Sequence, residues 1–129
     1  MSSQASIGTI ISDLQEFFSA LSDLNCAYRK VERLKTSEGR VHKVEAVFRD
    51  NLGRQAGLQK TDKGYQIITD CEGLSPVEAQ QQRESVQQIV QRYAYRKVLK
   101  ELQAQGYVVA EENHQPDNSI RLLVRKWAS

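Results

Sequence analysis

The stretch "QRYAYRKVLK", residues 91–100, places two tyrosines among four cations. Exposed rings beside cations would suit stacking on nucleic-acid bases and pairing with phosphates. The alternative is one helix whose rings face a core and whose cations face water. Helical periodicity favours the second interpretation, because successive residues turn by about 100°. On that geometry one apolar stripe contains Val86, Ile89, Val90 and Tyr93.

The apolar stripe changes sides inside the quoted stretch. After Tyr93 the apolar positions lie roughly 150° further round the helix. They are Ala94, Tyr95, Val98, Leu99 and Leu102. The cations occupy the remaining sides. This change predicts that the two halves of the helix bury against different elements, or that the first half covers a second subunit. It also predicts that Tyr93 and Tyr95 each pack under the sheet or at a subunit contact, on their own stripes.

The helix limits are visible on either side of the quoted stretch. Ser75 suits an N-cap, Pro76 suits the first helical position, and Glu78 lies three residues after Ser75, as in a capping box. The helical pattern runs to Gln105, and Gly106 follows as a C-terminal stop. We therefore expect one long helix over residues 76–105.

Shorter elements are predicted on both sides of this helix. Ser12 or Asp13 is an expected N-cap for an amphipathic helix that Asn25 ends, and alternation in "VHKVEAVFRD" puts His42, Val44, Ala46 and Phe48 on one strand face. The strands are predicted over 7–11, 27–36, 41–50, a hairpin around Asp62-Lys63-Gly64, and a final hairpin over 107–112 and 119–127. These elements predict an α+β fold, a single domain over residues 1–129. Two main helices pack against an antiparallel sheet of about six strands.

Composition is that of an ordinary globular protein. The chain has 129 residues, of which 40% are hydrophobic and 26% charged, and a formal net charge of +2. No apolar run approaches the roughly 20 residues that span a bilayer, so membrane insertion is not expected. The start "MSSQASIGTIISD" lacks the basic and long apolar parts of a secretory signal. These features predict a cytoplasmic protein.

The sequence contains no convergent catalytic or metal-binding set. Cys26 and Cys71 are expected to be free thiols, and neither His42 nor His114 stands at ligand spacing from a cysteine or another histidine. Cys71, in the loop "TDCEG", is the best candidate nucleophile, but no histidine lies near it in sequence. No phosphate-binding glycine loop is present. We therefore predict no enzyme activity, no metal and no cofactor.

Two basic segments, 29–43 and 92–100, are the remaining functional signal. The candidate binding residues are Arg29, Arg33, Arg40, Lys43, Arg92, Arg96 and Lys100. A cationic surface serves either nucleic acid or an acidic protein. The sequence lacks the aromatic platform motif of an RNA-recognition sheet, which weighs against RNA. Another protein is the favoured partner, and a homo-oligomer stays open.

The C-terminal part of the chain also resembles a known family. The segments "QRYAYRKVLKE", "QGYVVAEE" and "SIRLLVRKW" are similar to the signature of a family of small hypothetical proteins, catalogued as a domain of unknown function. That family is encoded in cyanobacteria and red-algal plastids, with relatives in other bacteria. A weaker likeness extends upstream through "SIGTIISDLQEFFSALSDL" and "AGLQKTDKGYQIITD". The start "MSSQ" and the loop "CEGLSP" depart from the family's usual Met-Ser-His-Phe start and its aromatic residues.

The resemblance implies a role rather than a reaction. Bacterial members are often encoded beside ATPases of the AAA class or small ferredoxin-like proteins, which suggests an accessory protein in assembly, maturation or regulation. The leading expectation is thus a non-enzymatic accessory protein that binds another protein, in a cyanobacterium-like organism. The alternative is a small nucleic-acid-binding module that uses segments 29–43 and 92–100.

Overall fold

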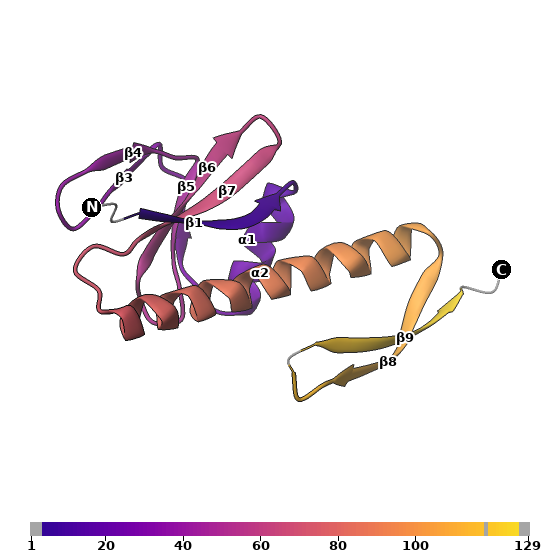
Figure 1. Ribbon diagram of the computed structural model, residues 1–129. Coiled ribbons are helices and arrows are strands. Elements are labelled where there is room, and N and C mark those ends of the chain that lie inside the picture. The colour runs from indigo at the N-terminus through magenta and orange to yellow at the C-terminus, as the bar shows by residue number, and fades with distance from the viewer. Residues whose placement is uncertain (1–3, 118, 127–129) are drawn as a thin grey trace. The chain divides into compact units, whose positions relative to one another are not determined.

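The computed structural model describes residues 4–117 and 119–126 of the chain (Figure 1). The elements, in chain order, are β1 (Gln4–Ile11), α1 (Leu14–Asp23), β2 (Tyr28–Arg29), β3 (Arg33–Lys35), β4 (Val41–Lys43), β5 (Ala46–Arg49), β6 (Gln55–Thr61), β7 (Gly64–Asp70), α2 (Pro76–Ala104), β8 (Tyr107–His114) and β9 (Ile120–Lys126). The predicted strand end at Trp127 lies outside the described residues.

The strands form three antiparallel sheets. The largest has five strands in the order β1-β7-β6-β5-β2, while β3 pairs with β4 and β8 pairs with β9 in two-stranded sheets. The predicted α+β class, with antiparallel strands and two main helices, is confirmed. The largest sheet has five strands, close to the predicted size of about six, and the other described strands lie in the two small sheets.

The predicted single strand over 41–50 is wrong, because the chain leaves one sheet and enters another in its middle. The Val44 N–H donates to Glu32 O at 2.9 Å, whereas the Glu45 N–H donates to Leu58 O at 2.7 Å. The backbone N–H groups of two consecutive residues therefore bond to two different neighbouring segments. The predicted common face of His42, Val44, Ala46 and Phe48 is lost: His42 pairs with Leu34 and is half-buried in β4, while Ala46 and Phe48 enter the main core.

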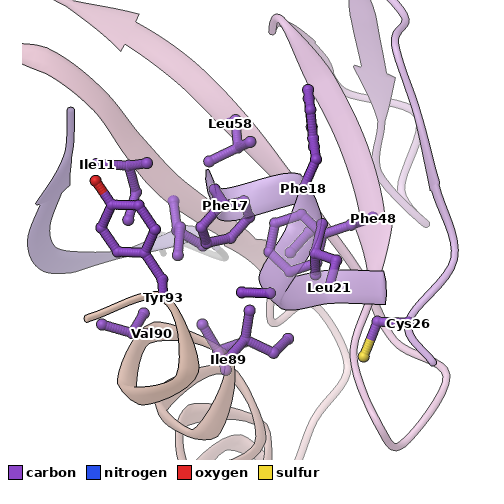
Figure 2. Packing of buried hydrophobic residues seen from close by; sticks show 14 of the residues in the cluster. Ile11, Phe17, Phe18, Leu21, Cys26, Phe48, Leu58, Ile89, Val90 and Tyr93 are labelled. Atoms are coloured by element: carbon purple, nitrogen blue, oxygen red, sulfur yellow. The ribbon is translucent and has the colours of Figure 1, made fainter. Parts of the chain in front are cut away.

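The main core lies where α1 and the first half of α2 meet the five-stranded sheet (Figure 2). Phe17 of α1 packs edge-on against Phe48 of β5, with ring centroids 5.4 Å apart, and lies 5.9 Å from the ring of Tyr93. Both phenylalanines are fully buried. The first apolar stripe of α2 points into this cluster through Val86, Ile89, Val90 and Tyr93. It covers the chain's own core, so the alternative that this half covers a second subunit is not what the structure shows.

Tyr93 also fixes the start of α1. Its hydroxyl oxygen accepts hydrogen bonds from the backbone N–H groups of Ser12 and Asp13, both at 3.0 Å. Asp13 is the N-cap of α1, and its carboxylate accepts from the Glu16 N–H at 3.1 Å. Asn25, with φ of 57°, follows the helix end, as its position in the sequence predicted. One α2 side chain thus joins the two helices through both apolar and polar contacts.

A second, smaller core covers the other face of the sheet. It contains Leu34, Val44, Val47 and Ile68. Adjacent residues point to opposite faces of a strand, so Ile67 enters the main core while Ile68 enters the second. Gly57 of β6 allows this close approach: a Cβ added there would lie 3.0 Å from Val44 Cγ1 and 3.2 Å from Leu34 Cδ2.

The limits of α2 follow the predicted capping chemistry. The Glu78 N–H donates to the Ser75 hydroxyl oxygen, and the Ser75 N–H donates to the Glu78 carboxylate, both at 3.2 Å. The helix begins at Pro76 and ends at Ala104, one residue before the predicted end. Gly106 follows with φ of 86°, a conformation that glycine adopts without steric cost.

The chain divides into two compact units at the point where the apolar stripe of α2 changes sides. The N-terminal unit is Met1–Tyr93 and the C-terminal unit is Ala94–Ser129. The prediction of a single domain over residues 1–129 stays a prediction. Within the described part of the chain, neither helix has the length and apolar character needed to cross a bilayer.

Candidate functional site

The structure divides the first basic segment, 29–43, between two sheets. Arg29 lies on β2, at the edge of the five-stranded sheet, where it pairs with Val47. Arg33 and Lys43 are brought together, since they are directly opposed residues of the β3–β4 pair and both are exposed. Like charges facing each other across strands repel, so this pair is an attractive position for an anion.

Arg40 belongs to the β3–β4 turn, which is held in place by Glu72 and Asp70. Its guanidinium lies 3.8 Å from the carboxylate of Glu72, whose side chain is almost fully buried. The same carboxylate accepts from the Glu38 N–H at 2.8 Å, and Asp70 accepts from the Ser37 N–H at 2.9 Å. The loop "TDCEG" therefore fastens the β3–β4 turn to the end of β7. Its acidic residues Asp70 and Glu72 thus hold this turn in place.

The second basic segment, 92–100, crosses the boundary between the two units. Arg92 lies in the N-terminal unit and forms an ion pair with Asp23 of α1, with 2.8 Å between Nε and Oδ2. Arg96 and Lys100 follow at four-residue intervals in the C-terminal unit, along one side of α2. The candidate residues thus do not form one patch within one compact unit.

Neither Cys26 nor Cys71 forms a disulfide bond with a described residue. Cys26 is buried beside Asn51, whose side-chain oxygen lies 3.4 Å from Sγ. Burial and the negative charge of Asp50 raise the pKa of the Cys26 thiol, which keeps it protonated and poorly nucleophilic. Asp50 itself accepts from the N–H groups of Leu52 and Arg54, both at 2.9 Å, and so shapes the turn after β5.

The C-terminal unit holds a feature that the basic residues alone did not indicate. None of its described side chains, over 94–117 and 119–126, is buried. Exposed fractions reach 46% for Val98, 36% for Val109 and 57% for Leu123. We call its apolar members the C-terminal apolar set: Tyr95, Val98, Leu99, Leu102, Tyr107, Val108, Val109, Ile120, Leu122, Leu123 and Val124.

Polar contacts hold the C-terminal unit together. The Tyr95 hydroxyl donates to the carboxylate of Glu112, 2.5 Å away, and the other oxygen of that carboxylate lies 2.8 Å from His114 Nε2. Tyr95 was predicted to pack under the sheet or at a subunit contact, yet it is only partly buried and is fastened to β8 by this hydrogen bond. The second half of α2 is therefore linked to β8 by hydrogen bonds at Glu112, whereas the first half is held by a packed apolar core.

The C-terminal apolar set was present in the sequence as a pattern without a partner. The strand "SIRLLVRKW" has apolar residues at consecutive positions, Leu122, Leu123 and Val124, so both faces of β9 carry one. The useful signal was the second apolar stripe of α2 together with these adjacent apolar residues of β9.

Comparisons with known proteins agree on one family. Residues 20–123 match the family described as "Protein of unknown function (DUF1257)". The chain is 27% identical over 132 residues to "Uncharacterized protein ycf35" of Pyropia yezoensis, with 98% of each chain covered. It is 28% identical over 131 residues to the protein of the same name from Cyanophora paradoxa, again with 98% of each covered.

No solved structure matches the chain. The family match spans most of the sequence, from within α1 to within β9, and so covers part of each compact unit. The resemblance inferred from "QRYAYRKVLKE" and "SIRLLVRKW" is confirmed by it. The chain belongs to the DUF1257 family of proteins of unknown function.

Proposed function

We propose that this chain is a cytoplasmic, non-enzymatic accessory protein that binds another protein in an assembly, maturation or regulatory pathway of a cyanobacterium-like organism. The observation that carries the proposal is the C-terminal apolar set, which is left without a buried member among the described residues. Its exposed members are Val98, Val109 and Leu123. Exposed apolar surface marks sites of interaction in proteins.

The small size of the C-terminal unit supports this role. The unit runs from Ala94 to Ser129. Chains shorter than roughly 40 residues usually need disulfides, metals or association to fold stably. Both cysteines lie in the N-terminal unit, so no internal disulfide can staple the C-terminal one. Association with another surface would stabilise so small a unit.

A capture experiment with matched baits tests the proposal. Tagged wild-type protein, Val98→Asp and Val77→Asp are each crosslinked in a cyanobacterial lysate, and the captured proteins are identified by mass spectrometry. Val77 lies on the same helix in the N-terminal unit and is 68% exposed, so it controls for a new charge on α2. We expect a reproducible partner with wild type and Val77→Asp that Val98→Asp loses. Equal capture by all three baits, or by none, contradicts the proposal.

Nucleic-acid binding is the second candidate, favoured by the opposed cations Arg33 and Lys43 on β3–β4. Binding of random single-stranded DNA and RNA, measured by fluorescence anisotropy, should then weaken steeply as salt rises, because each phosphate contact releases counterions. The double variant Arg33→Ala/Lys43→Ala should reduce that salt dependence. Absence of binding at low salt eliminates this candidate.

A further inference from the structure

The C-terminal unit ends in a two-stranded sheet whose strands are paired on one side only. Within the described residues, β8 pairs with β9 and with no other strand, and the same holds for β9. Each strand therefore presents an outer row of backbone N–H and C=O groups. Such an edge is a template for an extended segment of another chain.

The two edges differ in regularity. The pairing runs through every residue of β9, whereas the register shifts between Val109 and Glu111, which leaves Ala110 of β8 unpaired as a bulge. A bulge disrupts the regular spacing of donors and acceptors and protects an edge from further pairing. The β9 edge is thus the one on which a third strand can form.

The charges of the two edges also differ. β8 carries Glu111 and Glu112, whereas β9 carries Arg121, Arg125 and Lys126. All three β9 cations are exposed, and the structure places none of them in an ion pair with a described residue. Arg121, Leu123 and Arg125 alternate with Leu122 and Val124, so one face of β9 presents two cations on either side of an exposed leucine.

This pattern selects the occupant. A segment that alternates acidic and apolar residues would place carboxylates beside Arg121 and Arg125, and opposite charges on neighbouring strands attract. A second copy of β9 is disfavoured, because antiparallel pairing centred on Leu123 would set Arg121 directly against Arg125 of the other copy. A stacking surface for bases is disfavoured as well, since β9 has no aromatic side chain.

We propose that β9 accepts an extended acidic segment of a partner protein as a third strand of the β8–β9 sheet. The inference rests on the proposed function and gives it a partner chemistry and a surface. Main-chain hydrogen bonds along β9 supply the pairing, while Arg121 and Arg125 select acidic residues on one face. Leu122 and Val124 take apolar residues on the other.

The test uses the full-length protein and a labelled peptide of about nine residues, the length of a long strand, that alternates glutamate and valine. Fluorescence anisotropy should show binding that weakens with salt. Arg121→Glu/Arg125→Glu should weaken it by roughly tenfold or more, because both charge contacts become repulsive. Lys60→Glu/Lys63→Glu makes the same charge change at exposed positions of the β6–β7 hairpin and should leave the affinity unchanged.

Main-chain pairing needs its own readout, because charge alone would attract the peptide. Two versions of the peptide carry N-methyl groups on alternate residues. The first version blocks the N–H groups along one side of the peptide strand, and the second blocks those along the other side. Both keep every side-chain charge. One of the two should lose binding. Amide signals of residues 120–126 should shift in the NMR spectrum and exchange more slowly when the parent peptide is added.

Several results would overturn the proposal. Equal binding of the parent and both N-methylated peptides would show that no strand forms. Dimerisation, seen as a change in sedimentation and accompanied by slower amide exchange of residues 120–126, would identify a second copy as the occupant. Oligonucleotide binding that competes with the peptide would identify a nucleic acid. A partner lost by Val98→Asp but kept by Arg121→Glu/Arg125→Glu would leave the proposed function standing and refute this inference alone.

Discussion

The two halves of α2 have comparable apolar content and very different surroundings. In the first half, Val86 and Ile89 are 0% exposed and Tyr93 is 5% exposed. In the second half, Val98 is 46% exposed, and Leu99 and Leu102 are only half-buried. The first half meets α1 and a five-stranded sheet, whereas the second belongs to a unit with one hairpin. An apolar stripe therefore identifies the side of a helix that seeks a partner, and the rest of the chain determines whether that partner is present.

The largest expected effect separates the two tyrosines on which this comparison turns. Tyr93→Ala removes a buried ring and leaves two N–H groups at the start of α1 without their acceptor, so it should lower the free energy of unfolding by about 3–5 kcal/mol. Tyr95→Ala removes a half-exposed ring and one hydrogen bond, and should cost about 1 kcal/mol. Urea denaturation followed by circular dichroism measures both. Equal losses would contradict the contrast between the halves.

A smaller effect is expected where the N-terminal unit is packed most tightly. Gly57→Ala places a methyl group 3.0 Å from Val44 Cγ1, and overpacking of this kind costs about 1–3 kcal/mol. In a Leu34→Val background the same change should cost less, because one of the crowded atoms is removed. Leu123→Ala, at a position 57% exposed in the C-terminal unit, is the contrast and should change the stability of the isolated chain little. Thermal unfolding of Gly57→Ala, Leu34→Val, the double variant and Leu123→Ala measures these differences in stability.

Charges provide a third comparison between the units. Arg92→Ala breaks a partly exposed ion pair with Asp23 and should cost about 0.5–1 kcal/mol, less at high salt. Arg125→Ala, which breaks no ion pair with a described residue, should have no measurable effect on folding. Denaturation at low and high salt tests this. A larger loss for Arg125→Ala would mean that β9 already has an acidic contact within the chain.

The smallest effect concerns the start of α2 and depends on pH. Hydrogen bonds from the backbone N–H and then the hydroxyl of Ser75 hold the pKa of Glu78 below its ordinary value of 4.5. A carboxylate with a lowered folded-state pKa stabilises the protein above its unfolded pKa, and that contribution disappears as pH falls through the folded value. Glu78→Gln should therefore flatten the acid side of the stability curve. Glu101→Gln removes an exposed carboxylate near the other end of α2 and is the matched control. Denaturation as a function of pH measures both variants.

The sequence by itself determined the local features whose causes lie within a few residues. The capping box of Ser75 and Glu78, the stop at Gly106, the hairpin turn before Gly64 and the change of stripe at Tyr93–Ala94 are all present as predicted. Each depends on backbone geometry or on helical periodicity, which one chain segment specifies alone. The α+β class followed from the order of such elements.

Only the tertiary structure decided the features that depend on competing neighbours. The strand expected over 41–50 divides at Val44, because the Val44 N–H bonds to Glu32 O while the Glu45 N–H bonds to Leu58 O. Both acceptors lie in other segments of the chain. Arg92 and Arg40 were predicted as binding cations, yet Asp23 and Glu72 lie beside them. The exposure of Leu123 and Val98 was equally invisible, because hydrophobic burial depends on which surfaces the folded chain has left to cover. A sequence pattern shows which residues would gain from burial, and the folded structure determines which of them are buried.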